Sequence, residues 1–311
     1  MAGSSSQGVG LSMERVSGGR CPEALALLLT GRWGDPGRMV EGFRAYILQQ
    51  GLSLDLLWVA RMDGEPTAAV LLLPNVGRSA MVFVSPCRSQ EQAGVLTAVL
   101  SHAAESSEGL AGYLTQVLLE PSQRLEKSAV LLGGYEHLAD LGYLQRTLRE
   151  GDGSDAMPGG YRVETADVAP SGWLERVILS SYERTLDCPS LVGRRAIEDI
   201  VAGHKATGVF DPTLWFILVE EASEEPVGVT LINPLVQPGG YELVYLGVGV
   251  SHRGRGLAGW MMRYAMGALC GRSSSGTLYL AVDQRNVPAL KLYAGLGFRQ
   301  TAERAAYLRM L

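Results

Sequence analysis

The stretch that decides the interpretation of this chain is VGVSHRGRGLAG, residues 248–259. An apolar strand pattern over residues 241–250 runs into this glycine-rich turn, and an amphipathic helical pattern over residues 256–269 begins at once. Such a turn presents successive backbone N–H groups at a helix N-terminus, where they attract an anion. Its glycines let a phosphate approach the backbone, and Arg253 and Arg255 add positive charge. The alternative is a plain strand-to-helix turn that happens to be rich in glycine.

Strand and helix patterns alternate on both sides of this turn, which indicates an α/β (α+β) chain built on mixed sheets. In the second half, strands are expected at 161–166, 215–220, 227–233, 241–250, 277–282 and 307–310, and helices at 171–183, 194–202, 256–269 and 287–296. The first half repeats this order more weakly, with strands at 56–61, 67–73, 80–85 and 114–119 and helices at 90–104 and 124–132. We therefore expect two copies of one fold.

Turn-forming residues mark the expected domain boundaries. Residues 151–160, GDGSDAMPGG, separate two patterned segments in the manner of an interdomain linker. Residues 1–20 are rich in glycine and serine and predict a flexible tail. The expected domains are therefore residues 21–150 and residues 161–311.

The composition excludes several classes of function. The 311 residues include 27 Lys and Arg against 32 Asp and Glu, and a net charge of −5 argues against a broad nucleic-acid-binding surface. The four cysteines and four histidines are scattered, with neither metal-ligand spacing nor a disulfide framework. No apolar run is long enough to span a membrane, and the N-terminus lacks the pattern of a signal peptide, so we expect a cytoplasmic protein without a metal.

A second motif follows the turn. Asn286 begins the segment NVPA, and Tyr293 begins YAGLGF, which ends at Phe298. With both motifs in register, residues 248–298 resemble the GCN5-related N-acetyltransferase (GNAT) family, whose signature Q/R-x-x-G-x-G/A is met by RGRGLA at 253–258. The resemblance implies two tandem domains, each a mixed, splayed sheet flanked by helices, and acetyl-CoA as co-substrate.

The resemblance also implies where acetyl-CoA binds. The sheet of this family opens after the strand expected at 241–250, and the pantetheine arm lies in the opening. Backbone groups of that strand would pair with the arm and polarise the thioester, the turn would hold the pyrophosphate, and Asn286 would contact the thiol arm. The expected cofactor-binding residues are Leu246, Gly247, Val248, Arg253, Gly254, Arg255, Gly256, Leu257, Ala258, Gly259 and Asn286.

Two side chains are candidates for proton transfer. Tyr293 stands at the family's tyrosine position and would protonate the departing CoA thiolate; the alternative is an ordinary helix residue with its hydroxyl at the rim. Glu242 is the candidate base for the amine, directly or through a water, because a carboxylate pointing into a cleft has a raised pKa. Glu242 can instead bind a cationic group of the acceptor, or be an exposed residue at the start of its strand.

Strand alternation makes a further prediction about Glu242. It would share a face with Val244, Leu246 and Val248, while Tyr245 would point to the opposite face, into the core. The connection after the helix at 171–183 is expected to bind the acceptor, with Tyr182 and Asp187 as the candidates. A capped and solvated loop is the alternative there.

The first copy departs from the family pattern. Its turn, residues 86–94, lacks the glycine pair, carries Glu91 where a phosphate would lie and has only Arg88 in support. Glu120, Pro121 and Ser122 stand where the asparagine would be expected. We therefore expect a degenerate copy in which cofactor binding is doubtful.

Three functions are compatible with these motifs. The leading hypothesis is direct transfer of an acetyl group from acetyl-CoA to a primary amine of a small molecule in a ternary complex, as in the mycothiol synthases, which the tandem arrangement resembles. The alternatives are a non-catalytic, regulatory module that binds acyl-CoA and a protein or peptide N-acetyltransferase. A general acid at Tyr293 favours an enzyme, since binding alone needs none.

Overall fold

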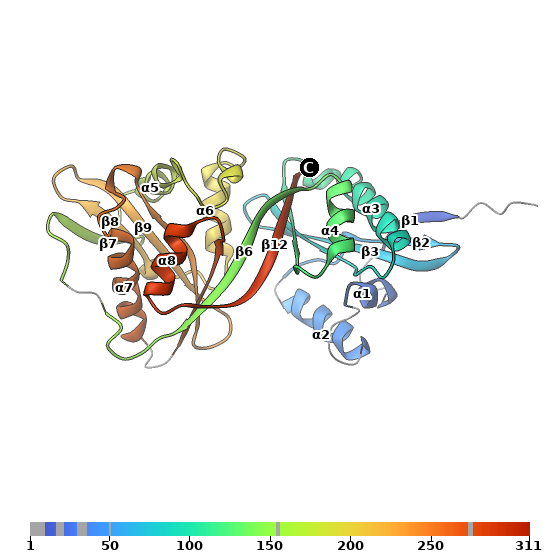
Figure 1. Ribbon diagram of the computed structural model, residues 1–311, viewed down its shortest axis with the longest axis horizontal. Helices are drawn as coiled ribbons and strands as arrows, with labels where there is room; N and C mark the ends of the chain where they lie inside the picture. Colours follow the sequence, from blue (N-terminus) through green and yellow to red (C-terminus); the bar gives the residue numbers. More distant parts are fainter. Residues whose placement is uncertain (1–9, 17–21, 30–35, 50, 154–155, 273–275) are drawn as a thin grey trace, which may run out of the picture. The chain divides into compact units, whose positions relative to one another are not determined.

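A computed structural model describes residues 10–16, 22–29, 36–49, 51–153, 156–272 and 276–311 of the chain. The chain divides into two compact units: unit 1 consists of Met1–Leu138 and Ala305–Leu311, and unit 2 consists of Ala139–Arg304. Each unit has a mixed sheet with helices on both of its faces (Figure 1).

Unit 1 has the strand order β1-β2-β3-β4-β5-β12, in which only the β4–β5 pair is parallel. Its strands are β1 (Leu11–Val16), β2 (Leu57–Met62), β3 (Glu65–Asn75), β4 (Ser79–Val84), β5 (Leu114–Leu119) and the last part of β12 (Arg299–Met310). Helices α1 (Pro22–Leu29) and α2 (Pro36–Gln49) contribute to the core on one face, and α3 (Gln90–Glu105) and α4 (Arg124–Leu132) to the core on the other.

Unit 2 repeats this order as β7-β8-β9-β10-β11-β6, and only the β10–β11 pair is parallel. Its strands are β7 (Tyr161–Thr165), β8 (Trp215–Glu220), β9 (Glu225–Pro234), β10 (Gly240–Val248), β11 (Thr277–Asp283) and β6 (Glu136–Thr147). Helices α5 (Trp173–Tyr182) and α6 (Ile197–Ala206) cover one face, and α7 (Leu257–Cys270) and α8 (Val287–Gly295) cover the other.

The apolar residues of β8 explain why this sheet is covered on both faces. Trp215 and Ile217 pack with α5 and α6, whereas Phe216 packs with α7. All three are buried, and successive residues of a strand point to opposite faces. A strand that is apolar at every position can therefore be stable only with a helical layer on each side.

The sixth strand of each sheet comes from an unexpected part of the chain. β6 follows the helices of unit 1, yet its residues 141–147 pair with β11 of unit 2. β12 follows α8 of unit 2, yet its residues 305–310 pair with β5 of unit 1. The boundary expected at 151–160 was placed from turn residues alone. In the structure the chain passes from unit 1 to unit 2 after Leu138 and returns to unit 1 after Arg304.

The tail expected over residues 1–20 is wrong where the structure describes it. Residues 11–16 form β1, which pairs with β2 along its full length. The strand lies at the sheet edge and buries none of its residues fully, so its weak alternation did not stand out in the sequence. Residues 1–9 and 17–20 lie outside the described residues.

Candidate active site

The sheet of unit 2 opens between its two parallel strands. β10 pairs with β11 only from Gly240, opposite Thr277, to Glu242, opposite Tyr279. Beyond this point lies a cavity of about 370 Å³. It is lined by residues 243–248 of β10, by Ala281 and Val282 of β11, by the turn and first residues of α7, by residues of α8 and by Asp187.

The turn before α7 leaves its amide groups unused. Gly254 and Gly256 have φ angles of +76° and +77°, a conformation that favours glycine. Gly256 is the N-cap of α7 and offers no side chain to cap the helix. None of the N–H groups of residues 254–259 donates a hydrogen bond to a described residue. Unpaired amides at a helix N-terminus, facing a cavity, form an anion site.

The two arginines of the turn have different surroundings. Arg253 lines the cavity and donates to the carbonyl oxygens of Val248 (2.9 Å), Ser181 (2.7 Å) and Arg184 (3.2 Å). It therefore joins the end of β10 to the C-terminal end of α5, where carbonyl groups attract a cation. Arg255 lies outside the cavity lining and donates to the Tyr161 hydroxyl and the Ser251 carbonyl.

A β-bulge changes the direction of the side chains along β10. Leu243 pairs with Ile232 and Tyr245 with Leu231, so Val244 is an extra residue. Glu242 and Tyr245 therefore share one face, and the predicted alternation is wrong beyond Val244. The periodicity of a single strand does not reveal a bulge, because a bulge is defined by the partner strand.

On the face of the sheet that carries Tyr245, β10 lies close to α5. The Tyr245 hydroxyl lies 2.7 Å from Ser181 Oγ, and its ring stacks on His204 with a centroid distance of 5.6 Å. A Cβ atom on Gly247 would come within 2.5 Å of Ser181 Oγ, so only glycine fits at this position. Tyr182 packs edge-on against Tyr245 and does not line the cavity.

Tyr293 lies on α8 at the cavity and is 6% exposed. Burial raises the pKa of its phenol above the ordinary value, and the charge of Asp187 raises it further. The hydroxyl therefore keeps its proton at neutral pH and is available as a proton donor. Asn286 lines the same cavity and caps α8, its Oδ1 accepting from the Ala289 amide at 3.3 Å.

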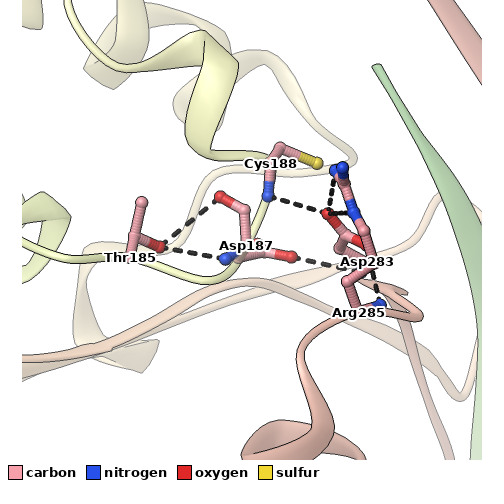
Figure 2. A network of polar contacts seen from close by, with 5 residues as sticks. All are labelled: Thr185, Asp187, Cys188, Asp283 and Arg285. Carbon is pink, nitrogen blue, oxygen red and sulfur yellow. Dashed lines mark hydrogen bonds and ion pairs between the residues drawn. The ribbon is translucent and has the colours of Figure 1, made fainter. Parts of the chain in front are cut away.

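Asp187 is held at the cavity by a polar network that the sequence did not predict (Figure 2). Its Oδ1 accepts from the Asp283 amide at 3.1 Å, and its own amide donates to Thr185 Oγ1. Asp283 is fully buried, and its carboxylate accepts from the Cys188 amide and from the Arg285 guanidinium, the latter at 2.7 Å. The loop after α5 is thereby fixed to the end of β11.

The pKa values of the two carboxyl groups in this network are shifted in opposite directions. Burial raises the pKa of Asp283, but the hydrogen bonds from Arg285 outweigh this and leave the pKa below its ordinary value. Burial raises the pKa of Asp187, the Asp283 amide opposes the shift and the Asp283 charge adds to it. Asp187 is open to solvent on one side and forms no ion pair with a described residue, so it suits a cationic ligand.

Glu242 lies beside the cavity rather than in its lining. It is opposite Tyr279 of β11, whose side chain is exposed, so this part of the sheet face is open. Burial raises the pKa of the Glu242 carboxyl, and no hydrogen bond to it is found among the described residues. The Glu242 carboxyl therefore has the raised pKa that suits a base. Because its side chain does not line the cavity, a proton from the cavity would reach it through a bridging water.

The expected site residues thus fall into two sets. Those that line the cavity are Asp187, Leu246, Gly247, Val248, Arg253, Gly254, Gly256, Leu257, Ala258, Gly259, Asn286 and Tyr293. Those outside the lining are Tyr182, Glu242 and Arg255. Sequence reasoning missed Asp283 and Arg285; the one available signal was their place at the carboxyl end of a parallel strand, where ligand-binding residues often lie.

Comparison with known proteins agrees with this geometry. Residues 185–298, which include the turn, β11 and α8, match the model of the Acetyltransferase (GNAT) family. The match covers less than half of the chain, so it shows a similarity to the GNAT family in the segment that carries the cavity. A mycothiol acetyltransferase of Kineococcus radiotolerans is 35% identical over 115 residues, a segment that spans 37% of this chain and 36% of the relative.

Solved structures extend the similarity to the fold of both units of this chain. A GCN5-related N-acetyltransferase from Sphaerobacter thermophilus superimposes with a TM-score of 0.61, 18% identity and coverage of 96% of this chain and 95% of the other. A tandem GNAT protein from the clavulanic acid biosynthesis pathway superimposes with a TM-score of 0.53 and 18% identity. The match covers 96% of this chain and 98% of the other. At such identities the likeness concerns the fold alone, which is a tandem GNAT fold.

Two further findings concern the described residues only. They contain no helix long and apolar enough to cross a membrane. They also contain no cluster of three or more His, Cys, Asp or Glu side chains placed to hold a metal ion.

Proposed function

We propose that this protein is an acetyl-CoA-dependent N-acetyltransferase that transfers an acetyl group directly to a primary amine of a small molecule. One observation carries the proposal: the unused amides of residues 254–259, the buried hydroxyl of Tyr293 and the carboxylate of Asp187 belong to one cavity. An anion site suits the pyrophosphate of acetyl-CoA, a proton donor suits the leaving thiolate, and a carboxylate suits a cationic acceptor.

The residues of the cavity fit acetyl-CoA, which supplies the acetyl group as a thioester. The amides of the turn would hold the pyrophosphate, and Arg253 would keep the turn in place through its three carbonyl contacts. β10 has lost β11 as a neighbour beyond Glu242, so the edge of Leu246–Val248 is free to pair with the pantetheine amides and to polarise the thioester carbonyl. Asn286 would lie near the thiol arm.

The transfer consists of one nucleophilic attack and the proton transfers that accompany it. An acceptor that arrives as an ammonium ion is held by Asp187 and first passes one proton through a water to Glu242. The neutral nitrogen then forms a bond to the thioester carbon, the bond between that carbon and sulfur breaks, and the nitrogen gives its second proton to water. Tyr293 gives its proton to the leaving sulfur and recovers one from water.

The acceptor is proposed to be a small cationic amine. Asp187 lines the cavity and has no protein cation to pair with among the described ion pairs, and Glu242 precedes Leu243, which also lines the cavity. The Kineococcus relative is called a mycothiol acetyltransferase, and its similarity covers the segment with the cavity. The amine precursor of mycothiol is therefore the first acceptor to try.

Calorimetric titration with acetyl-CoA tests the cofactor site. Gly256→Glu places bulk and negative charge in the anion site and should abolish binding. Gly172→Glu is the matched control, because Gly172 is also an N-cap glycine with a positive φ and an open surrounding, at the start of α5. Wild type and the control should each bind about one equivalent; absence of binding in wild type would end the proposal.

A second assay separates catalysis from binding alone. Released thiol is followed with a library of small amines, with peptides and with no acceptor, for wild type and Tyr293→Phe. Thiol release with small amines that Tyr293→Phe reduces supports the proposal. Release only with peptides would favour a peptide N-acetyltransferase, and binding without any release would favour a regulatory module.

A further inference from the structure

Unit 1 contains the counterpart of the anion-binding turn, in the segment between β4 and α3. The helices that follow the two parallel strands match closely: Gln123, the N-cap of α4, has φ −80° and ψ 66°, the same values as Asn286, the N-cap of α8. Gln123 is therefore the counterpart of Asn286, and the expectation that Glu120–Ser122 hold this place is wrong by one position. Three residues further on, Glu126 corresponds to Ala289, which lines the cavity in unit 2.

Glu126 points its carboxylate at the turn of unit 1. Its Oε1 accepts from the Cys87 amide at 2.6 Å, and the residue is only 4% exposed. Burial, and secondly the charge of Glu126, raise the pKa of the Cys87 thiol to about 12. No ion pair of Glu126 is found within the described part of the chain. A buried carboxylate without a cation is stabilised there by the backbone dipoles of the turn.

The neighbouring amides of this turn are also occupied. The Arg88 amide donates to Gln92 Oε1 at 2.7 Å, and the Gln92 amide donates to Ser89 Oγ at 3.2 Å. This arrangement resembles a capping box, except that Gln92 accepts from Arg88 rather than from the N-cap Ser89, and it satisfies one amide of the first turn of α3 and one amide before it. In unit 2 the corresponding amides have no such partners.

The space between the two helices is closed as well. Thr97 of α3 donates its hydroxyl to the Ala129 carbonyl of α4 at 3.3 Å. The buried side chains of Leu96, Leu100 and Val130 belong to one core cluster. In unit 2 the residues of α7 and α8 instead line the cavity from its two sides.

We propose that the Glu126 carboxylate takes the place of a ligand phosphate in unit 1, so that unit 1 carries its anion within the chain and binds no CoA. The chemistry is that of an anion on backbone amides, with the anion supplied by α4. The proposal concerns unit 1 alone and holds whether or not the cavity of unit 2 is catalytic.

Chemical rescue tests the role of the carboxylate. Glu126→Ala leaves the Cys87 amide buried and unpaired, and should lower the melting temperature by roughly 3–10 °C. Sodium formate, which can enter the vacated space, should restore part of this loss when compared with an equal concentration of sodium chloride. Wild type and Glu91→Ala, which removes an exposed carboxylate from the first turn of α3, should show no formate effect. Equal formate effects in all three proteins would overturn the proposal.

The number of CoA sites provides a test that does not depend on the folding of Glu126→Ala. Glu126→Gln keeps the shape and one acceptor oxygen, and serves as the folded variant. The proposal expects Gly256→Glu to lose all CoA binding in both the wild-type and the Glu126→Gln background. CoA binding that survives Gly256→Glu while Glu126 is present would place a site in unit 1 and refute the proposal. Absence of any CoA binding would contradict the proposed function of unit 2 and leave the formate experiment to decide on unit 1.

Discussion

At the scale of single residues, the environment of each titratable group around the cavity fits a different step. Tyr293 is buried and keeps its proton, while Glu242 is half-buried and its carboxyl has no hydrogen-bond partner among the described residues. Asp187 is anchored through Asp283 and faces the cavity. The same three side chains could not be assigned these differences from sequence, because burial depends on the tertiary fold.

Tyr293→Phe is expected to lower kcat by about 10²- to 10⁴-fold, the usual contribution of a general acid. The Kd for acetyl-CoA should stay within about threefold of wild type, because the ring still fills its place. Stopped-time thiol release and calorimetry measure the two quantities. Tyr279→Phe, at an exposed tyrosine of β11, is the control, and an unchanged kcat in Tyr293→Phe would remove Tyr293 from the chemistry.

Glu242→Gln is expected to stabilise the protein at neutral pH. Burial raises the pKa of Glu242 above its ordinary 4.5, so its stabilising contribution is complete below that ordinary value and is lost as pH rises through the folded pKa. The melting temperature of Glu242→Gln should therefore exceed that of wild type at pH 8 and match it near pH 4. Glu183→Gln, at an exposed position in the loop after α5, should match wild type at both.

The pH dependence of kcat in Glu242→Gln tests whether this carboxylate also acts as the base. If the carboxylate accepts the proton, wild-type kcat falls as pH drops through the raised pKa, and this acid limb disappears in the variant. If kcat falls at low pH in the same way in wild type and in Glu242→Gln, another group is the base.

Asp187→Asn is expected to raise the KM for a cationic acceptor by about tenfold or more, since a hydrogen-bonded charge pair contributes about 1.5–3 kcal/mol. Acetyl-CoA binding should change little, because Asp187 lies apart from the turn. Initial rates with varied acceptor measure the effect, and Glu183→Gln again serves as the control. A rise confined to the KM for acetyl-CoA would contradict the assignment of Asp187 to the acceptor.

At the scale of secondary-structure elements, the cavity depends on how β10, α5 and α7 meet. The turn, the strand before it and the helix after it were predicted within one or two residues, since glycine punctuation and periodicity are local signals. The bulge at Val244 was not, and neither was the contact of Glu126 with the turn before α3. Both depend on partners that are distant in sequence.

Arg253→Gln is expected to weaken acetyl-CoA binding by about 10- to 100-fold, although the guanidinium binds only carbonyl groups in the structure. Three hydrogen bonds from a charged donor fix the turn against α5, and their loss lets the amides move away from a productive arrangement. Arg255→Gln is the matched control, because Arg255 lies outside the cavity lining and should change the Kd by less than about threefold. Equal losses of acetyl-CoA affinity in Arg253→Gln and Arg255→Gln would mean that the turn needs positive charge rather than the hydrogen bonds of Arg253.

At the scale of the whole molecule, each unit completes its sheet with a strand that follows the other unit's helices in the chain. Tyr307 of β12 is fully buried in the core of unit 1, with α3 and α4. The sequence predicted a strand at 307–310 and placed it in the second domain, because a hydrophobic pattern does not say which neighbour a strand will pair with. β6 was not predicted at all.

Tyr307→Ala is expected to destabilise unit 1 by about 3–5 kcal/mol, the usual cost of emptying a buried aromatic site. Hydrogen exchange read by mass spectrometry should show faster exchange in β5 and α3, with β10 and α7 unchanged. Tyr279→Ala, at an exposed site in unit 2, should cost less than about 1 kcal/mol. Loss of protection confined to β10 and α7 in Tyr307→Ala would assign β12 to unit 2.

The exchanged strands also set an order of events during synthesis on the ribosome. β6 is made before the rest of unit 2, so unit 2 has every strand of its sheet available as soon as β11 has emerged. Unit 1 has to wait, because the partner of β5 is translated only after the whole of unit 2. Until then β5 presents an unpaired edge, the kind of surface on which strands of other chains pair. The nascent chain therefore depends on the fast folding of its second half to protect its first.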